Sequence, residues 1–137
     1  MIIDAENLIL GRLASFAAKE SLIGNEIKII NCKDAVVIGS RKNILSKYKK
    51  NSERKTPRKG PFIPRTTDRF VKRTIRGMLP RDRSKGREAM KRIRCYKSIP
   101  ESLKSKETLL LDKINVHKTS NINFVRVQEI CKHLGGK

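Results

Sequence analysis

The sequence predicts one α/β domain, with a mainly parallel β-sheet of about four strands covered by helices and a basic extension of helices and a loop. Its 137 residues suffice for a single hydrophobic core. Short apolar segments rich in β-branched residues alternate with segments of helical periodicity, which is typical of βαβ units. Positive charge is concentrated in the middle of the chain. We therefore expect residues 1–137 to form one domain, with its basic region at about 41–94.

The N-terminal part shows the alternation most clearly. MIID predicts a short buried strand, and EIKIIN and AVVI predict two more, because each is short and β-branched. Between the first two, AENLILGRLASFAAKESLIG predicts a helix that ends at Gly24. Its apolar residues recur at helical spacing, at Leu10, Leu13, Ala14 and Ala17.

A basic helix and a loop come next. SRKNILSKYKKN predicts a helix capped by Ser40. ERKTPRKGPFIPRTT, from Glu53 to Thr67, holds five cations, three prolines and a glycine, so we expect a loop. This loop is either an ordinary flexible linker or a rigid cationic segment that follows a phosphate backbone. We prefer the second interpretation because of its charge and its prolines.

The segment RFVKRTIRGMLP, from Arg69 to Pro80, predicts a helix with two different faces, with Thr66 or Thr67 as its cap. One face is apolar and is expected to pack, with Val71, Ile75, Met78 and Leu79. The opposite face is basic and is expected to bind a partner, with Arg69, Lys72, Arg73 and Arg76. We expect Gly77 and Pro80 to end the helix at a corner.

After that corner, SKGREAMKRIRCY predicts a second basic amphipathic helix. One stripe carries Arg87, Lys91 and Arg94, and the side away from it carries Ala89, Met90 and Ile93. Alternatively, the two helices are core helices with solvated backs. IPESLKSKET reads as a surface connection, NINFVRV as a last strand, and QEICKHLGG as a short final helix with Ile130 and Leu134 facing inward.

The charge of the chain restricts its partners. Lys and Arg number 33 against 13 Asp and Glu, which gives a net charge of +20. The net charge is −1 from Met1 to Ser40, +17 from Arg41 to Arg94 and +4 from Cys95 to Lys137. A solvated charged face normally mixes signs to limit self-repulsion, so we favour a nucleic-acid surface. An anionic membrane is the weaker alternative, because the basic helices lack a Trp- or Phe-rich face.

Catalytic and metal-binding patterns are not visible in the sequence. There is no GxxxxGK[ST], and no GxGxxG opens a helix after a strand, so a phosphate cradle is unsupported. The CKH at 131–133 lacks partners at metal-ligand spacing. Asp4, Glu6 and Asp34 lie at the ends of expected strands or helices, where turns and caps explain them. We expect no enzymatic activity, no cofactor, no metal and no small-molecule substrate.

The cysteines and the N-terminus indicate the compartment. Cys32, Cys95 and Cys131 are an odd number, far apart in the sequence and without a CxxC pair, which argues for reduced thiols in the cytosol. No apolar run approaches the length of about 18 residues that would suggest a membrane span. MIIDAEN lacks the basic start and apolar stretch of a signal peptide. We expect a cytoplasmic protein that is neither exported nor membrane-spanning.

Three blocks of the sequence resemble the signature blocks of the universal large-subunit ribosomal protein L13 (uL13) family. They are IIDAENLILGRLAS, INCKDAVVIGSRKNILSKY and FVKRTIRGMLPRDRSKGREAMKRIRCY. The most specific part is RTIRGMLP followed by a basic stretch and GR. NINFVRVQEICKHLGG and the short length are similar to archaeal members of the family. Residues 98–118 carry no motif that can be aligned.

The resemblance implies a compact α/β domain that binds large-subunit rRNA during assembly, on the solvent side, with ribosomal protein L3 as a neighbour. Gly77 and Pro80 would set the corner rather than contact RNA. Carried onto this sequence, the RNA-facing candidates are Arg65, Arg69, Lys72, Arg73, Arg76, Arg81, Arg83, Lys85 and Arg87, with Arg41, Lys42, Lys47, Lys49 and Lys50 as a second patch. To these the loop adds Arg58 and Lys59, and the second basic helix adds Lys91.

Two other functions use some of the same features. A free-standing nucleic-acid-binding regulator would carry the same charge. It would also be expected to show a dimerising surface or a groove-reading helix, and neither is visible in the sequence. An enzyme on a nucleotide-binding α/β scaffold comes third, because its phosphate motifs are missing.

Overall fold

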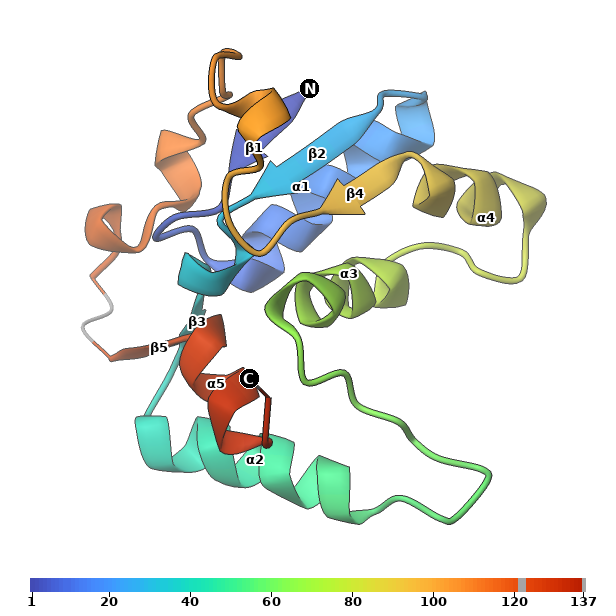
Figure 1. The fold of residues 1–137 in the computed structure, drawn as a ribbon, viewed down its shortest axis with the longest axis vertical. Helices are drawn as coiled ribbons and strands as arrows, with labels where there is room; N and C mark the ends of the chain where they lie inside the picture. The colour runs from blue at the N-terminus through green and yellow to red at the C-terminus, as the bar shows by residue number, and fades with distance from the viewer. Residues whose placement is uncertain (121–122, 137) are drawn as a thin grey trace.

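The computed structural model describes residues 1–120 and 123–136 and shows one mixed α/β domain (Figure 1). The main sheet is parallel and has the order β1-β2-β4, from β1 (Ile2–Asp4), β2 (Ile27–Ile30) and β4 (Ile93–Cys95). A separate antiparallel pair consists of β3 (Val36–Ile38) and β5 (Phe124–Arg126). The prediction of a mainly parallel sheet covered by helices is confirmed, with the strands divided between two small sheets.

The central strand β2 fixes the core. Ile27, Ile29 and Ile30 are all buried, as expected for a parallel strand that is covered on both faces. Ile29 pairs with Ile3 on one side and with Cys95 on the other. The helix α1 (Leu10–Ile23) packs behind this sheet in Figure 1 and contacts β2, α3 (Thr67–Gly77) and α4 (Ser84–Lys91). Its predicted core residues are all buried.

The end of α1 follows the sequence prediction. Gly24 is the C-cap, with a φ of 123° that L side chains rarely adopt, and its N–H donates to the Glu20 carbonyl oxygen. Ser40 likewise stands at the N-cap of α2 (Arg41–Glu53), although its side chain makes no capping hydrogen bond. Thr66 occupies the N-cap of the next helix, also without a side-chain bond.

Two predictions for the basic region are wrong. The second basic helix, α4 (Ser84–Lys91), stops before Ile93, which is the first residue of β4 and pairs with Ile27. Pairing in a buried sheet stabilises this segment more than its helical periodicity does. Met78 is 42% exposed rather than packed, because α3 (Thr67–Gly77) ends one residue before it and the helical phase stops there.

The C-terminal part closes the fold beside α2. The last helix, α5 (Val127–His133), contacts α2 and α3, with Ile130 buried and Leu134 partly buried as predicted. Of the predicted strand NINFVRV, residues 124–126 form β5, and residues 121 and 122 lie outside the described part. Residues 97–118 form an irregular connection with three short 3₁₀ turns, and Leu109 pairs with Ile3 beside β1. Among the described residues, no helix has the length and apolarity needed to cross a bilayer.

Candidate nucleic-acid interface

The helix α3 separates packing residues from cationic residues. Val71 and Ile75 are fully buried in the core that α1 and the sheet share. On the other side, Arg69 and Arg76 are exposed, and Lys72 and Arg73 are half-buried. The two-faced helix predicted from the sequence is therefore present, apart from Met78.

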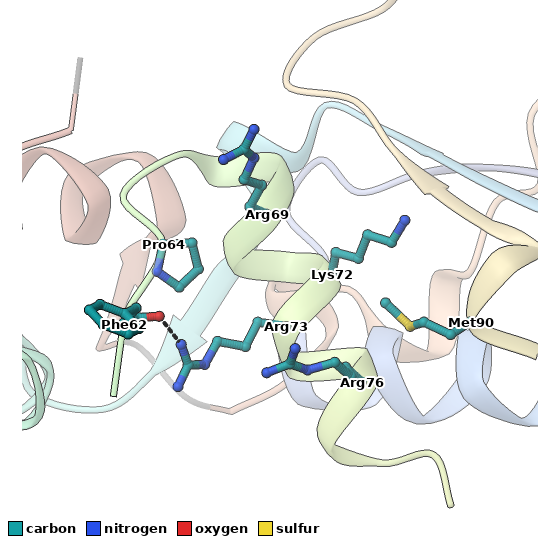
Figure 2. A pocket seen from close by; sticks show the side chains of 7 residues that line it. All are labelled: Phe62, Pro64, Arg69, Lys72, Arg73, Arg76 and Met90. Atoms are coloured by element: carbon teal, nitrogen blue, oxygen red, sulfur yellow. Dashed lines mark hydrogen bonds between the residues drawn. The ribbon is translucent and has the colours of Figure 1, made fainter. Parts of the chain in front are cut away.

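The basic face of α3 opens onto a hollow of about 330 Å³. Figure 2 shows Arg73 reaching from α3 to the loop before it, where its Nη1 donates a hydrogen bond to the Phe62 carbonyl oxygen. This bond fixes the loop against the helix. The hollow is lined by Phe62, Pro64, Arg69, Lys72, Arg73, Arg76 and Met90.

Two neighbouring hollows continue the hollow at α3, one toward β4 and one toward α4. A hollow of about 400 Å³ shares Arg69 and Lys72 and continues to β4, with Asp68, Arg94, Cys95 and Tyr96. A hollow of about 220 Å³ shares Arg76 and Met90 and continues to α4, with Leu79, Arg81, Gly86 and Arg87. Because lining residues are shared, the three form one continuous depression, which we call the basic furrow. Seven cations and one carboxylate line it.

The corner between α3 and α4 positions one end of the furrow. Gly86 is buried, and a Cβ built on it would lie 2.0 Å from the Pro80 carbonyl oxygen. This close approach of backbone to backbone requires glycine. Gly77, in contrast, is exposed, and a Cβ there would meet no heavy atom within 4 Å. The sequence interpretation named Gly77 and Pro80 but missed Gly86, whose partner lies across the turn.

A second cationic surface lies on α2, which Figure 1 shows on the far side of α3 from the main sheet. Its predicted residues are all exposed, although Arg41 pairs with Glu129 and Lys49 lies 4.0 Å from Glu53. An edge-to-face contact between Tyr48 and Phe70, with ring centroids 5.1 Å apart, connects α2 to α3. We call the surface the α2 patch; it consists of Arg41, Lys42, Lys47, Lys49 and Lys50.

The remaining predicted cations surround these two surfaces. Arg58, Lys59 and Arg65 are exposed on the loop between α2 and α3, and Arg83, Lys85 and Lys91 are exposed on or beside α4. No predicted RNA-facing residue is buried. The structure adds Phe62, Arg94 and Tyr96, which were not predicted as site residues. An exposed aromatic residue inside a cationic, proline-rich loop is a signal that could have identified Phe62.

The structure brings two of the three cysteines together. Cys32 and Cys95 are distant in the sequence, but interaction with the Cys95 side chain raises the pKa of the Cys32 thiol, and burial raises it further; the Cys32 thiol donates to the Ile29 carbonyl oxygen. Burial raises the pKa of Cys131 to about 11, and the nearby Asp68 carboxylate adds to that rise. All three are free thiols. Cys32 and Cys131 therefore remain protonated at neutral pH.

The carboxylates singled out in the sequence serve the fold. Asp4 accepts hydrogen bonds from the Glu6 N–H and from the Asn31 side chain, both at 3.0 Å. Asp34 lies 3.7 Å from Arg126 and 3.9 Å from Lys33. Within residues 1–120 and 123–136, no group of three or more His, Cys, Asp or Glu side chains is arranged to hold a metal ion.

Comparison with known proteins agrees with this description. The model of the family described as ribosomal protein L13 matches residues 1–102. A protein of Methanosarcina barkeri named large ribosomal subunit protein uL13 is 42% identical, covering 99% of this chain and 98% of the relative. Proteins of the same name from Methanocaldococcus jannaschii and Thermoplasma volcanium are 43% and 36% identical, each covering at least 98% of both chains.

Proposed function

Because the chain belongs to the ribosomal protein L13 family of the large ribosomal subunit, we propose that it is a structural constituent of that subunit which binds large-subunit rRNA and supports assembly. The RNA-binding surface in this proposal consists of the basic furrow, the α2 patch and the loop between them. The observation that supports it best is the division of α3, whose apolar face is committed to the core while its cations face a hollow.

The proposed mechanism is neutralisation of phosphates by a preformed surface. Arg and Lys side chains contact phosphate oxygens, which position the RNA without reading its sequence. Arginine contributes more where a contact is bidentate, because its planar guanidinium matches two phosphate oxygens. The loop at residues 54–66, fixed to α3 by Arg73, would enter an RNA groove, so recognition depends mainly on RNA shape.

We also propose where the chain is located in the cell and which protein lies next to it. The relatives are named as large-subunit proteins, which supports a location in the cytoplasmic ribosome. Ribosomal protein L3 as a direct neighbour remains an inference from the family resemblance. Chemical cross-linking of purified subunits, followed by identification of the peptides joined to this chain, would test that neighbour.

Density-gradient fractionation of a native lysate, at moderate and then at high salt, tests the proposed function. We expect the protein to sediment with the large subunit and to remain there after the high-salt wash. Release into the light fractions, or absence from the subunit at both salt concentrations, would indicate a loosely bound factor or a separate nucleic-acid-binding regulator instead.

A further inference from the structure

Phe62 is an aromatic side chain that lies outside the hydrophobic core. It is 68% exposed, yet it lies in the loop directly beside the cations of α3. Single exposed apolar residues are common on protein surfaces, but Phe62 lines a hollow among cations, where a ligand could cover it. Among the described residues that line the central hollow, four are cations and none is a carboxylate.

The position of Phe62 is fixed in advance of binding. Gly60 has a φ of +87°, and a Cβ built on it would lie 3.1 and 3.2 Å from two ring atoms of Phe62. The ring is therefore packed along the Gly60 backbone and is otherwise largely open to solvent. The Phe62 carbonyl oxygen accepts the hydrogen bond from Arg73. A side chain held in this way loses little conformational entropy when a ligand covers it.

We propose that Phe62 is a stacking platform for one unpaired nucleobase, while the phosphates of the same strand contact Arg69, Lys72, Arg73 and Arg76. An exposed aromatic ring next to a row of cations is the arrangement that binds single-stranded nucleic acid, because every base has a π face and every nucleotide a negative charge. The central hollow of about 330 Å³ falls within the size range of small-ligand sites. This inference rests on the proposed function and adds to its shape-based mechanism a contact to a base.

An acidic or apolar protein segment is the other class of partner that an exposed phenylalanine could bind. The observations favour RNA, because the lining combines cations with an aromatic ring, and the same cations continue along the furrow toward Arg94 and Arg87. A protein partner would leave this row of cations without a matching row of charges unless it were strongly acidic. A protein partner bound at Phe62 is therefore an alternative that the experiment below distinguishes from RNA.

Three variants of the full chain separate stacking from charge and from general hydrophobicity. Phe62→Leu keeps an apolar side chain but removes the π face, and Phe62→Tyr keeps the ring. Ile23→Ala is the matched control, because Ile23 is 66% exposed at the end of α1 and outside the furrow. None of these changes removes a cation, so all three variants should show the same salt dependence of binding as the unmodified protein.

Two probes are used, so that failure of this inference and failure of the proposed function can be told apart. With a short oligoadenylate, we expect Phe62→Leu to weaken binding by about 5- to 150-fold, the range that corresponds to loss of one stacked base. With an abasic ribose-phosphate oligomer of equal length, Phe62→Leu should bind as the unmodified protein does. Phe62→Tyr and Ile23→Ala should match the unmodified protein on both probes.

Equal binding of Phe62→Leu and the unmodified protein to oligoadenylate would overturn the stacking inference, whatever the protein does with rRNA. Failure of the unmodified protein to prefer a large-subunit rRNA transcript over an unrelated RNA of equal length would count against the proposed function alone. Short-wavelength ultraviolet cross-linking in intact large subunits adds a direct readout: a nucleotide adduct on Phe62 supports the inference. Nucleotide adducts on other residues of the basic furrow without one on Phe62 contradict it and favour a protein partner at this position.

Discussion

The backbone of Gly86 rests on the carbonyl group of Pro80, so closely that a Cβ at Gly86 would lie 2.0 Å from the carbonyl oxygen. This contact sets the turn between α3 and α4 and hence the relative positions of Arg76 and Arg87, which line the same hollow. A residue without a side chain thus determines where two cations of the furrow lie.

Gly86→Ala is expected to destabilise the protein by about 1–3 kcal/mol, because the turn has to move to accept the methyl group. Gly77→Ala is the matched control at the other side of the corner, where a Cβ meets nothing within 4 Å. Alanine has less backbone freedom than glycine, so Gly77→Ala should leave the stability of the protein unchanged or raise it by about 0.5 kcal/mol. Guanidinium denaturation of both variants measures the two effects; equal stabilities would show that the Gly86 contact does not constrain the corner.

Two adjacent residues of α3 should respond in opposite ways to substitution. Ile75→Asp places a carboxylate in the core, where Ile75 is 0% exposed, so we expect a loss of more than about 3 kcal/mol of stability or no folding. Arg76→Gln changes an exposed side chain, so its melting temperature should hardly change, while the salt slope of rRNA binding falls by about 1. Thermal melts and filter binding measure both. Similar melting temperatures for the two variants would contradict the assignment of the faces.

The stability of the protein should depend on the Cys131 thiol at alkaline pH. Burial raises its pKa from 9.0 to about 11, so the unfolded state loses this proton first as the pH rises. The contribution to stability is complete below pH 9 and is lost as the pH approaches 11. Other effects of alkaline pH act on the unmodified protein as well as on Cys131→Ala, so the comparison of the two isolates the thiol. We therefore expect the difference in melting temperature between the two to shrink from pH 8 to pH 11, and a constant difference would argue against the buried neutral thiol.

Binding to rRNA should depend steeply on salt. If about ten cations of the furrow, the α2 patch and the loop contact phosphates, the log–log slope of the binding constant against salt is roughly −7 to −9. Titrations of the full chain with a large-subunit rRNA transcript at several salt concentrations give this slope. A value of about −2 would mean that only two or three phosphates are contacted, which is too few for an extended surface.

Local sequence patterns predicted the elements whose periodicity and caps agree with their tertiary surroundings. The helix that ends at Gly24 and the two-faced helix at Val71 and Ile75 are of this kind. Ile93 is the clearest failure, because its sequence continues the helical pattern of α4 while its pairing with Ile27 is decided by a strand far away in the chain. A pattern within residues 84–95 holds no information about pairing with Ile27.

The candidate site, too, was predictable from the sequence only in part. Charge could be predicted, since each cation proposed from the sequence is at least partly exposed. Shape could not: the furrow exists because β4 brings Arg94 beside Arg69 and because Gly86 lets α4 turn close to Pro80. The interaction between Cys32 and Cys95 was missed for the same reason, because it joins the turn that follows β2 to the neighbouring strand β4.

Lysine footprinting of the full chain, free and bound to a large-subunit rRNA transcript, shows directly whether RNA covers the basic furrow and the α2 patch. We expect RNA to protect from acetylation the predicted RNA-facing lysines of the furrow, the α2 patch, the loop and α4, namely Lys42, Lys47, Lys49, Lys50, Lys59, Lys72, Lys85 and Lys91. The internal controls are lysines that are also exposed but lie outside the basic region, Lys19, Lys104, Lys106 and Lys113, and these should stay reactive. Protection of the control lysines, with Lys72 and the lysines of α2 left reactive, would place the RNA on another face and rule out the proposed RNA-binding surface.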